Sequence, residues 1–205
     1  MKEVTIEAFP GLPFIGRHHD DGRIEIVPPK NARPCGSCTA CCTVMPVSEI
    51  KKAAHVRCEH LGSAAKRCKV YATRPQSCEV WWCMWAVNPV MAGALRPDHS
   101  HIVVDMEPER LVKRDDETGE EVAIPAIVAW PDPKYPEAYL DAVFLDALEK
   151  LCRVVGGPAL IRRGSLDGFV IYPPGMLPGQ PDEWVEVSSQ TNPNLLPRDF
   201  RHGTG

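Results

Sequence analysis

The sequence lacks the features that would assign the protein to a membrane, to a nucleic acid or to the secretory pathway. No apolar run approaches the roughly 20 residues that a transmembrane helix needs. Lys and Arg form no basic run, and the formal net charge of −4 disfavours nucleic-acid binding through a general positive field. Glu3, Glu7, Pro10 and Pro13 stand where a signal peptide would need its apolar core. We therefore expect a cytoplasmic protein that binds neither membranes nor nucleic acid.

The familiar catalytic motifs are also missing. The sequence contains no G-x-G-x-x-G, no P-loop, no H-E-x-x-H and no G-x-S-x-G. Dinucleotide binding, nucleotide binding, zinc-protease chemistry and serine-hydrolase chemistry are therefore unsupported. Whether the protein is an enzyme stays open at this stage.

Cysteine is nearly absent from most of the chain and dense in one segment. Only Cys152 lies outside residues 35–83, which hold the other eight: Cys35, Cys38, Cys41, Cys42, Cys58, Cys68, Cys78 and Cys83. Thiols at this density bond to one another or to metal. Structural disulfides are rare in a reducing compartment, and pairing would leave one of the nine cysteines over. We interpret the eight as metal ligands, with a disulfide framework as the alternative.

The spacing of the first four cysteines is typical of metal sites. Cys35 and Cys38 form a C-x2-C turn that directs both sulfurs inward, and Cys41 extends it to a spacing that supplies three ligands to an iron–sulfur cluster. Adjacent Cys41 and Cys42 can hardly both face one tetrahedral ion, so we expect them to serve different sites or to bridge two metals. A single cluster with spare thiols is one possible arrangement. The count favours two four-thiolate centres, one from the first four cysteines and one from Cys58, Cys68, Cys78 and Cys83.

The local charge agrees with two loaded centres. Residues 35–85 contain seven Lys or Arg and three Glu, a balance of +4. Eight thiolates and two dipositive centres would bring the segment to zero. Two zinc ions and two [4Fe-4S]2+ clusters satisfy this balance equally, so the charge supports metal binding without choosing the metal.

Several other side chains near the segment are weaker candidates. His55, His60, His99 and His101 are near the cysteines in sequence, but a lone histidine is more often a surface or satisfied side chain than a ligand. Cys152 falls on the apolar face of an expected helix and is interpreted as a buried structural thiol.

The wider pattern predicts an α+β fold. We expect a compact cysteine-rich metal module with short helices, packed with a small antiparallel sheet and one long C-terminal helix. The expected boundaries are an extended lead-in at 1–32, the metal module at 33–106, a sheet-and-helix continuation of the same domain at 107–178 and a Pro-rich tail at 179–205. The clearest helix begins at Pro136, presents apolar residues at helical spacing and ends at Gly156.

The cysteine pattern resembles a known family. The matching residues are Cys35-x2-Cys38-x2-Cys41-Cys42, Cys58-x2-Leu61, Cys68-x-Val70-Tyr71-x2-Arg74-Pro75-x2-Cys78-x4-Cys83-x-Trp85 and Leu95-Arg96-Pro97-Asp98. They resemble the YkgJ-like family of bacterial cysteine-cluster proteins, described as zinc- or iron-chelating. The resemblance spans about residues 33–106 and implies that all eight cysteines are metal ligands. A related cluster in flagellin lysine N-methylases implies that such a module can serve an iron–sulfur enzyme.

These observations predict a metal-binding protein that holds zinc or iron–sulfur centres through eight thiolates, with metal ions as its partners. Two other functions use the same residues. One is an iron–sulfur-dependent redox or group-transfer enzyme. The other is a zinc-stabilised adaptor that binds a protein partner through the Pro-rich tail at 179–205.

Overall fold

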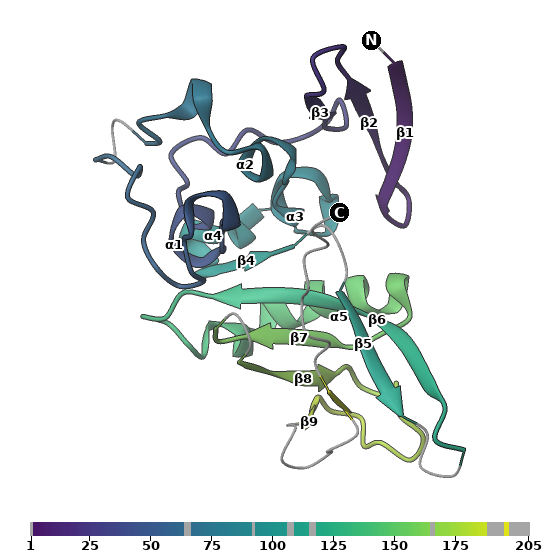
Figure 1. Ribbon diagram of the computed structural model, residues 1–205. Coiled ribbons are helices and arrows are strands. Elements are labelled where there is room, and N and C mark those ends of the chain that lie inside the picture. The colour runs from purple at the N-terminus through teal and green to yellow at the C-terminus, as the bar shows by residue number, and fades with distance from the viewer. Residues whose placement is uncertain are drawn as a thin grey trace.

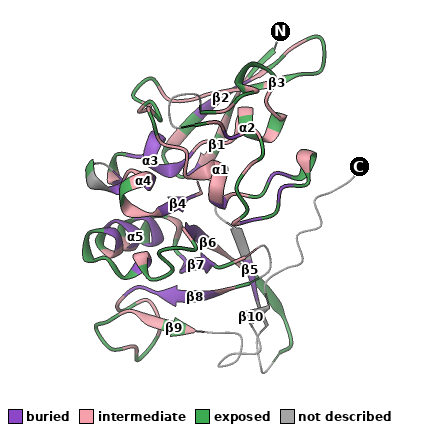
Figure 2. Ribbon diagram, turned by 90° about the vertical axis from the view of Figure 1, so that its left-hand side faces the viewer, coloured by how far each residue is buried: buried purple, intermediate pink, exposed green. Residues whose placement is uncertain are grey.

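The computed structural model describes residues 2–63, 67–91, 93–105, 109–114, 118–164, 167–187 and 195–196. Its fold is α+β, with two sheets and short helices between them (Figure 1). The cysteine segment lies between the sheet formed by the N-terminal residues and the larger sheet formed by the second half of the chain, in both Figure 1 and Figure 2.

The N-terminal residues form an antiparallel three-stranded sheet. Its strands are β1 (Lys2–Phe9), β2 (Leu12–His18) and β3 (Ile24–Val27). The predicted extended lead-in is thus a folded element, because the turn at Gly11, with φ of +75°, reverses the chain and pairs Phe9 with Leu12. Phe9 and Phe14 are each 1% exposed and join the main core, which anchors this sheet to the rest of the protein.

The larger sheet has seven strands among the described residues. Six of them lie in the order β10-β5-β6-β7-β8-β9, and the seventh, β4, also pairs with β6. Their bounds are β4 (Ile102–Val104), β5 (Glu109–Arg114), β6 (Glu121–Pro131), β7 (Ala159–Arg162), β8 (Gly168–Tyr172), β9 (Val185–Val187) and β10 (Leu195–Leu196). The expected small antiparallel sheet is therefore larger and mixed. β6 and β7 are parallel, because the chain between them returns along α5 (Ala142–Val155).

Helix α5 begins later than predicted and is not at the end of the chain. Asp141 caps it by accepting a hydrogen bond from the backbone N–H of Phe144 at 3.0 Å, and Gly156 ends it with φ of +72°. Four further strands of the described residues follow it, β7 to β10, so the expected C-terminal helix is an internal crossover. Leu140 and Val143, which the apolar spacing placed on the buried face, are 56% and 59% exposed.

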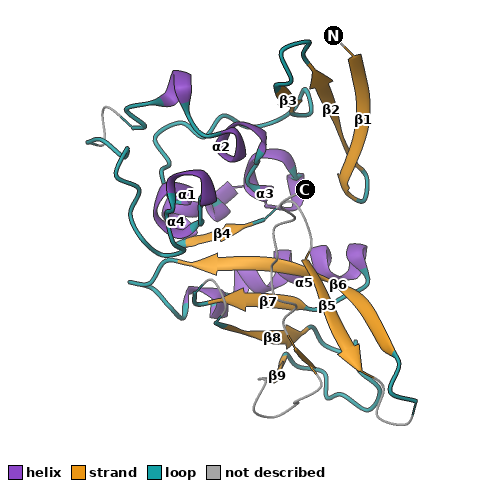
Figure 3. Ribbon diagram, in the orientation of Figure 1, coloured by secondary structure: helices purple, strands orange, loops and turns teal. Residues whose placement is uncertain are grey.

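The cysteine segment folds into single turns rather than long helices (Figure 3). These are α1 (Cys41–Val44), η1 (Ser48–Ile50), η2 (Tyr71–Thr73), α2 (Gln76–Val80), α3 (Met84–Val87), η3 (Pro89–Met91), η4 (Gly93–Leu95) and α4 (Pro97–Ser100). α2 and α3 are separate turns, because Trp81 and Cys83 between them have extended backbone conformations. Cys83 also forms an isolated antiparallel β-bridge with Asp105, and this backbone pairing joins the cysteine segment to the larger sheet beside β4.

One apolar core connects all three regions. Buried side chains come from the first sheet, from the cysteine segment and from α5 with the strands that it covers: Phe14, Met84, Val103, Ile127 and Leu148 are examples. A second, smaller cluster centred on Leu160 lies elsewhere on the larger sheet. Figure 2 shows the purple buried segments continuing from α3 and β4 into β6, β7 and β8. None of the described helices combines the length and apolar character needed to cross a membrane.

Candidate metal centre

All eight clustered cysteines are free thiols and lie close to one another without being arranged as a finished metal site. None of them forms a disulfide. Among the described residues, no three Cys, His, Asp or Glu side chains form a group that could hold a metal ion as they stand. The backbone nevertheless brings the thiols together into two adjoining neighbourhoods.

The first neighbourhood joins both ends of the cysteine segment. Cys35 and Cys38 form a turn in which the Cys38 N–H donates to the Cys35 carbonyl at 3.0 Å, with Gly36 at φ of +57°. Burial raises the pKa of Cys83 to about 12, and the nearby thiols of Cys35 and Cys38 add to that rise. The charges of Cys83 and Cys35 also raise the pKa of Cys41. Cys83 therefore lies with the first run of cysteines, not with its neighbours in the sequence.

The second neighbourhood gathers thiols from three separate turns. The Cys58 N–H donates to the Cys42 carbonyl at 2.9 Å, which holds these two backbones side by side. The pKa of Cys78 is raised by burial and then by the charges of Cys42, Glu49 and Cys58. Cys42 thus lies beside Cys58 and Cys78 and also borders the first neighbourhood, through its hydrogen bond with Cys41 and the effect of its charge on Cys35.

Cys68 is brought toward this second neighbourhood by a backbone bridge. Cys68 pairs with Leu61, and the Leu61 N–H donates to the Cys58 carbonyl at 3.1 Å. The Lys69 N–H donates to the His60 carbonyl at 2.8 Å and continues the pairing. The loop therefore folds back on itself and returns Cys68 to the region of Cys58.

Adjacent Cys41 and Cys42 differ sharply in acidity. A hydrogen bond from Cys41, together with the charges of Lys52 and Arg57, lowers the pKa of Cys42 to about 7 against the opposing effect of burial. The same hydrogen bond, with burial, raises the pKa of Cys41 well above its ordinary value. The two residues start α1, and their hydrogen bond places the two thiols side by side.

Lys52 is buried beside the second neighbourhood. It is 8% exposed, and its ammonium donates to the carbonyls of Met45 and Ala53. Burial lowers its pKa, and the negative charges that oppose this effect come from cysteines: Cys58, Cys42, Cys41 and Cys78. In the part of the chain that the structure describes, Lys52 has no ion pair with a carboxylate. The burial of Lys52 was not predicted, because Lys51 and Lys52 are indistinguishable in the sequence and only the Val47–Lys52 bridge separates them.

Two arginines accompany the first neighbourhood. The guanidinium carbon of Arg33 lies 5.1 Å from the centroid of the Trp85 ring, and its guanidinium donates hydrogen bonds to the backbone carbonyls of Trp85 and Asn88. Burial lowers the pKa of Arg33, and the charge of Cys83 opposes that effect. Arg96 donates to Asp98 at 2.6 Å and to the Ser37 hydroxyl at 3.1 Å, so it joins α4 to the turn at 35–38.

The pairing of Arg96 with Asp98 also orders the surroundings of Cys38. Hydrogen bonds from Arg96 lower the pKa of Asp98. The backbone N–H groups of Ala40 and Asp98 face the Cys38 thiol and partly offset the rise in its pKa that burial causes. Such N–H groups stabilise a negative sulfur, as metal-bound thiolates require.

Glu49 fixes the turn that carries Cys78. Its carboxylate accepts hydrogen bonds from the Ser77 N–H at 2.9 Å and from the Ser77 hydroxyl at 2.8 Å. This contact ties η1 to the first turn of α2. Arg74, a candidate donor to a thiolate, instead donates to the Cys78 carbonyl at 3.1 Å and stacks on Tyr71.

The four histidines have different surroundings. The side chain of His99 is 65% exposed. The His60 Nε2 atom lies 3.8 Å from Oε1 of Glu59. His101 stacks on Tyr135 with ring centroids 3.7 Å apart. Both ring nitrogens of His55 are buried and have no hydrogen-bond partner within the described residues.

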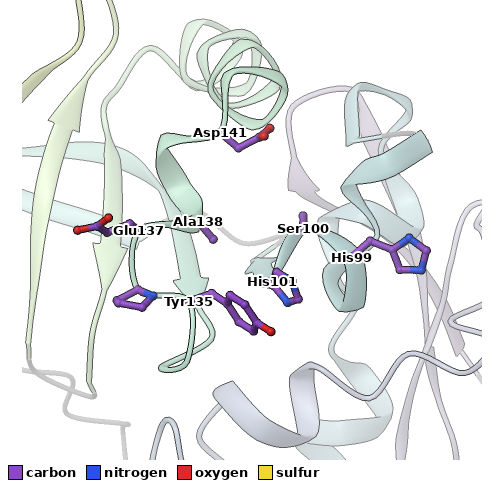
Figure 4. A pocket seen from close by; sticks show the side chains of 8 residues that line it. His99, Ser100, His101, Tyr135, Glu137, Ala138 and Asp141 are labelled. Carbon is purple, nitrogen blue, oxygen red and sulfur yellow. The ribbon is translucent and has the colours of Figure 1, made fainter.

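A shallow cavity of about 410 Å³ lies beside α4, and Figure 4 shows the side chains that line it. His101 and Tyr135 lie together in it, with Glu137 and Asp141 around them, while His99 points away. α4 thus borders the cavity through His99 and Ser100 and contacts the cysteine turn through the neighbouring Arg96 and Asp98.

Cys152 is separate from the other thiols, as predicted. It is 0% exposed on the apolar side of α5, and burial raises its pKa to about 12. It is therefore a neutral thiol in the core.

Comparisons with protein-family models, with curated proteins and with solved structures find no match for this chain. The YkgJ-like resemblance of the cysteine pattern stays a prediction.

Proposed function

We propose that the protein binds zinc ions or iron–sulfur clusters through the thiolates of its eight clustered cysteines. The observation that carries this proposal is that free thiols up to 48 positions apart in the sequence lie near one another: Cys83 near Cys35 and Cys38, and Cys78 near Cys42 and Cys58. The donor set suits a four-coordinate thiolate centre in each neighbourhood. Binding would require the thiols to lose their protons and the sulfurs to converge on the metal.

The surrounding groups support this assignment. Backbone N–H groups face Cys38 and Cys83, and the cations Arg33, Lys52 and Arg96 lie near the thiols. Without negative sulfur, a buried Lys52 would have no compensating charge among the described residues. Free thiols and bound metal both require a reducing environment, so the proposal includes a cytoplasmic location.

The proposal places this chain with the YkgJ-like cysteine-cluster proteins and gives the segment at 33–106 the role of a metal module, packed on the sheet and helix that follow. An iron–sulfur enzyme and a zinc-stabilised adaptor would use the same thiolates. No contact among the described residues favours either of them specifically. Most of the last 18 residues of the tail at 179–205 lies outside the described residues.

The test is metal analysis of protein purified without oxygen. We expect about two zinc ions per chain in a colourless protein, or iron and sulfide with absorption near 400 nm in a brown one. The Cys152→Ala variant is the matched control and should retain the same metal. Protein that contains neither metal, does not take one up and shows disulfides by mass spectrometry would overturn the proposal.

A further inference from the structure

The chain order of the eight cysteines differs from their order in space. The sequence suggested one centre from residues 35–42 and another from residues 58–83. In the structure, Cys83 lies near Cys35 and Cys38, and Cys42 lies near Cys58 and Cys78. The exchange concerns one cysteine from each group.

We propose that the cysteines divide into two centres at the Cys41–Cys42 peptide bond, and that buried Lys52 supplies the counter-charge of the second centre. The first centre takes Cys35, Cys38, Cys41 and Cys83, and the second takes Cys42, Cys58, Cys68 and Cys78. This inference rests on the proposed metal binding and adds which thiolates share a metal.

The backbone gives the first reason for this division. Cys41 and Cys42 are consecutive in α1 and their thiols share a hydrogen bond, so the two centres meet at this pair. The hydrogen bond between the Cys58 N–H and the Cys42 carbonyl ties Cys42 to the second group. Glu49 holds the turn of Cys78 to η1, and η1 lies between the two residues of the Val47–Lys52 bridge.

The position of Cys83 gives the second reason. Cys83 lies between α2 and α3, and its bridge to Asp105 draws it to the first strand of the larger sheet, away from the turn that holds Cys78. Arg33, which precedes the first cysteine, reaches the backbone of α3 through the Trp85 carbonyl. The ends of the cysteine segment are thereby held together.

Charge gives the third reason. A dipositive ion with four thiolates carries a net charge of −2, and burying that charge is costly without a nearby cation. Lys52 is 8% exposed and faces three thiols of the second group together with Cys41. Arg57 also lies near Cys42, so two cations of this chain match the charge of the second centre.

Cadmium-113 is the probe that tests the division, because it takes the place of zinc and gives one NMR resonance for each centre. The unaltered chain is loaded with 113Cd²⁺ alone, and correlations from cysteine Hβ protons to cadmium assign each thiolate to a resonance. We expect two resonances, with Cys83 correlated to the same one as Cys38, and Cys42 correlated to the same one as Cys78. No cysteine is replaced, so loss of folding cannot obscure the result.

Lys52→Met tests the counter-charge, and Lys51→Met is the matched control because Lys51 is an exposed neighbour. In a chelator competition we expect Lys52→Met to weaken only the second centre, by about 10-fold or more, and Lys51→Met to change neither. Equal weakening of both centres, or none, would overturn the role of Lys52.

The outcomes separate the two proposals. A chain that takes up no cadmium through thiolates and contains neither zinc nor iron when purified without oxygen refutes the proposed function itself. Two cadmium resonances with Cys42 and Cys38 on the same one leave metal binding intact and refute the division. A single resonance shared by all eight cysteines also refutes it.

Discussion

Two cysteines offer a direct comparison, because Cys83 and Cys152 are both buried thiols whose pKa values are raised to about 12 by burial. Their surroundings differ. Cys83 has Cys35 and Cys38 beside it, whereas Cys152 lies on α5 among apolar side chains such as Leu148. We expect Cys83→Ser to lose metal and Cys152→Ser to keep it.

The cost of Cys152→Ser follows from where its hydroxyl would lie. The site is 0% exposed, so the new hydroxyl can donate only to the carbonyl one helical turn earlier or stay unpaired. The expected loss is about 1–3 kcal/mol in the free energy of unfolding. For a chain of this size that lowers Tm by about 2–12 °C. The Cys152 carbonyl still accepts from Gly156 and Gly157 at 2.9 and 3.1 Å, so the helix end stays intact.

The assay combines metal content per chain with thermal unfolding of both variants under a reducing atmosphere. Cys152→Ser should retain the full metal content at a lower Tm. Cys83→Ser should contain less metal than Cys152→Ser, although both variants replace a buried thiol. Equal metal loss in the two variants would refute the separation of core and ligand thiols, and full metal retention in Cys83→Ser would refute the role of Cys83.

Two further predictions use local geometry. In metal-free protein at pH 7, iodoacetamide should modify Cys42 about sixfold faster than in the Cys41→Ala variant, because a pKa of about 7 leaves roughly half of Cys42 as thiolate. Peptide mapping should show this rate rising through pH 7 and then levelling, and a rise only above pH 8 would contradict the Cys41 hydrogen bond. Gly157→Ala should destabilise the protein by about 3 kcal/mol, because a Cβ there would lie 1.8 Å from the Pro125 carbonyl oxygen. Gly164→Ala, whose Cβ would come no nearer than 3.5 Å to another atom, is the control in urea unfolding, and equal losses would contradict the prediction.

The local signals that predicted secondary structure were those confined to a few residues. Gly156 ends α5 as predicted. β6 runs through Pro125 and pairs with β5 at that residue. The first hairpin was not predicted, because residues 1–32 were expected to be an extended lead-in, although Gly11 gives a turn signal there.

The candidate site was predictable in its members but not in its arrangement. Spacing identifies which residues carry thiols, because C-x2-C fixes the local turn. Which thiols are neighbours depends on contacts between distant segments, such as the Cys83–Asp105 bridge. Lys52 was missed for the same reason, since burial of a lysine is decided by tertiary packing and not by its sequence neighbours. Conversely, Leu140 and Val143 fit an apolar pattern and are nonetheless exposed. Leu140 precedes the helix, and Val143 lies in its first turn but not among the residues that α5 buries, such as Phe144.

The shared apolar core has a consequence for how this cysteine segment can be used in other proteins. Small zinc modules can often be excised and fused elsewhere, since each is held together by its own metal. Here Met84, Val87 and Val103 are buried against α5 and the strands of the larger sheet. Cutting the segment out would expose these side chains to water and favour aggregation. The cysteine segment therefore cannot be fused to another protein by itself. A fusion that keeps it folded has to include α5 and the larger sheet as well.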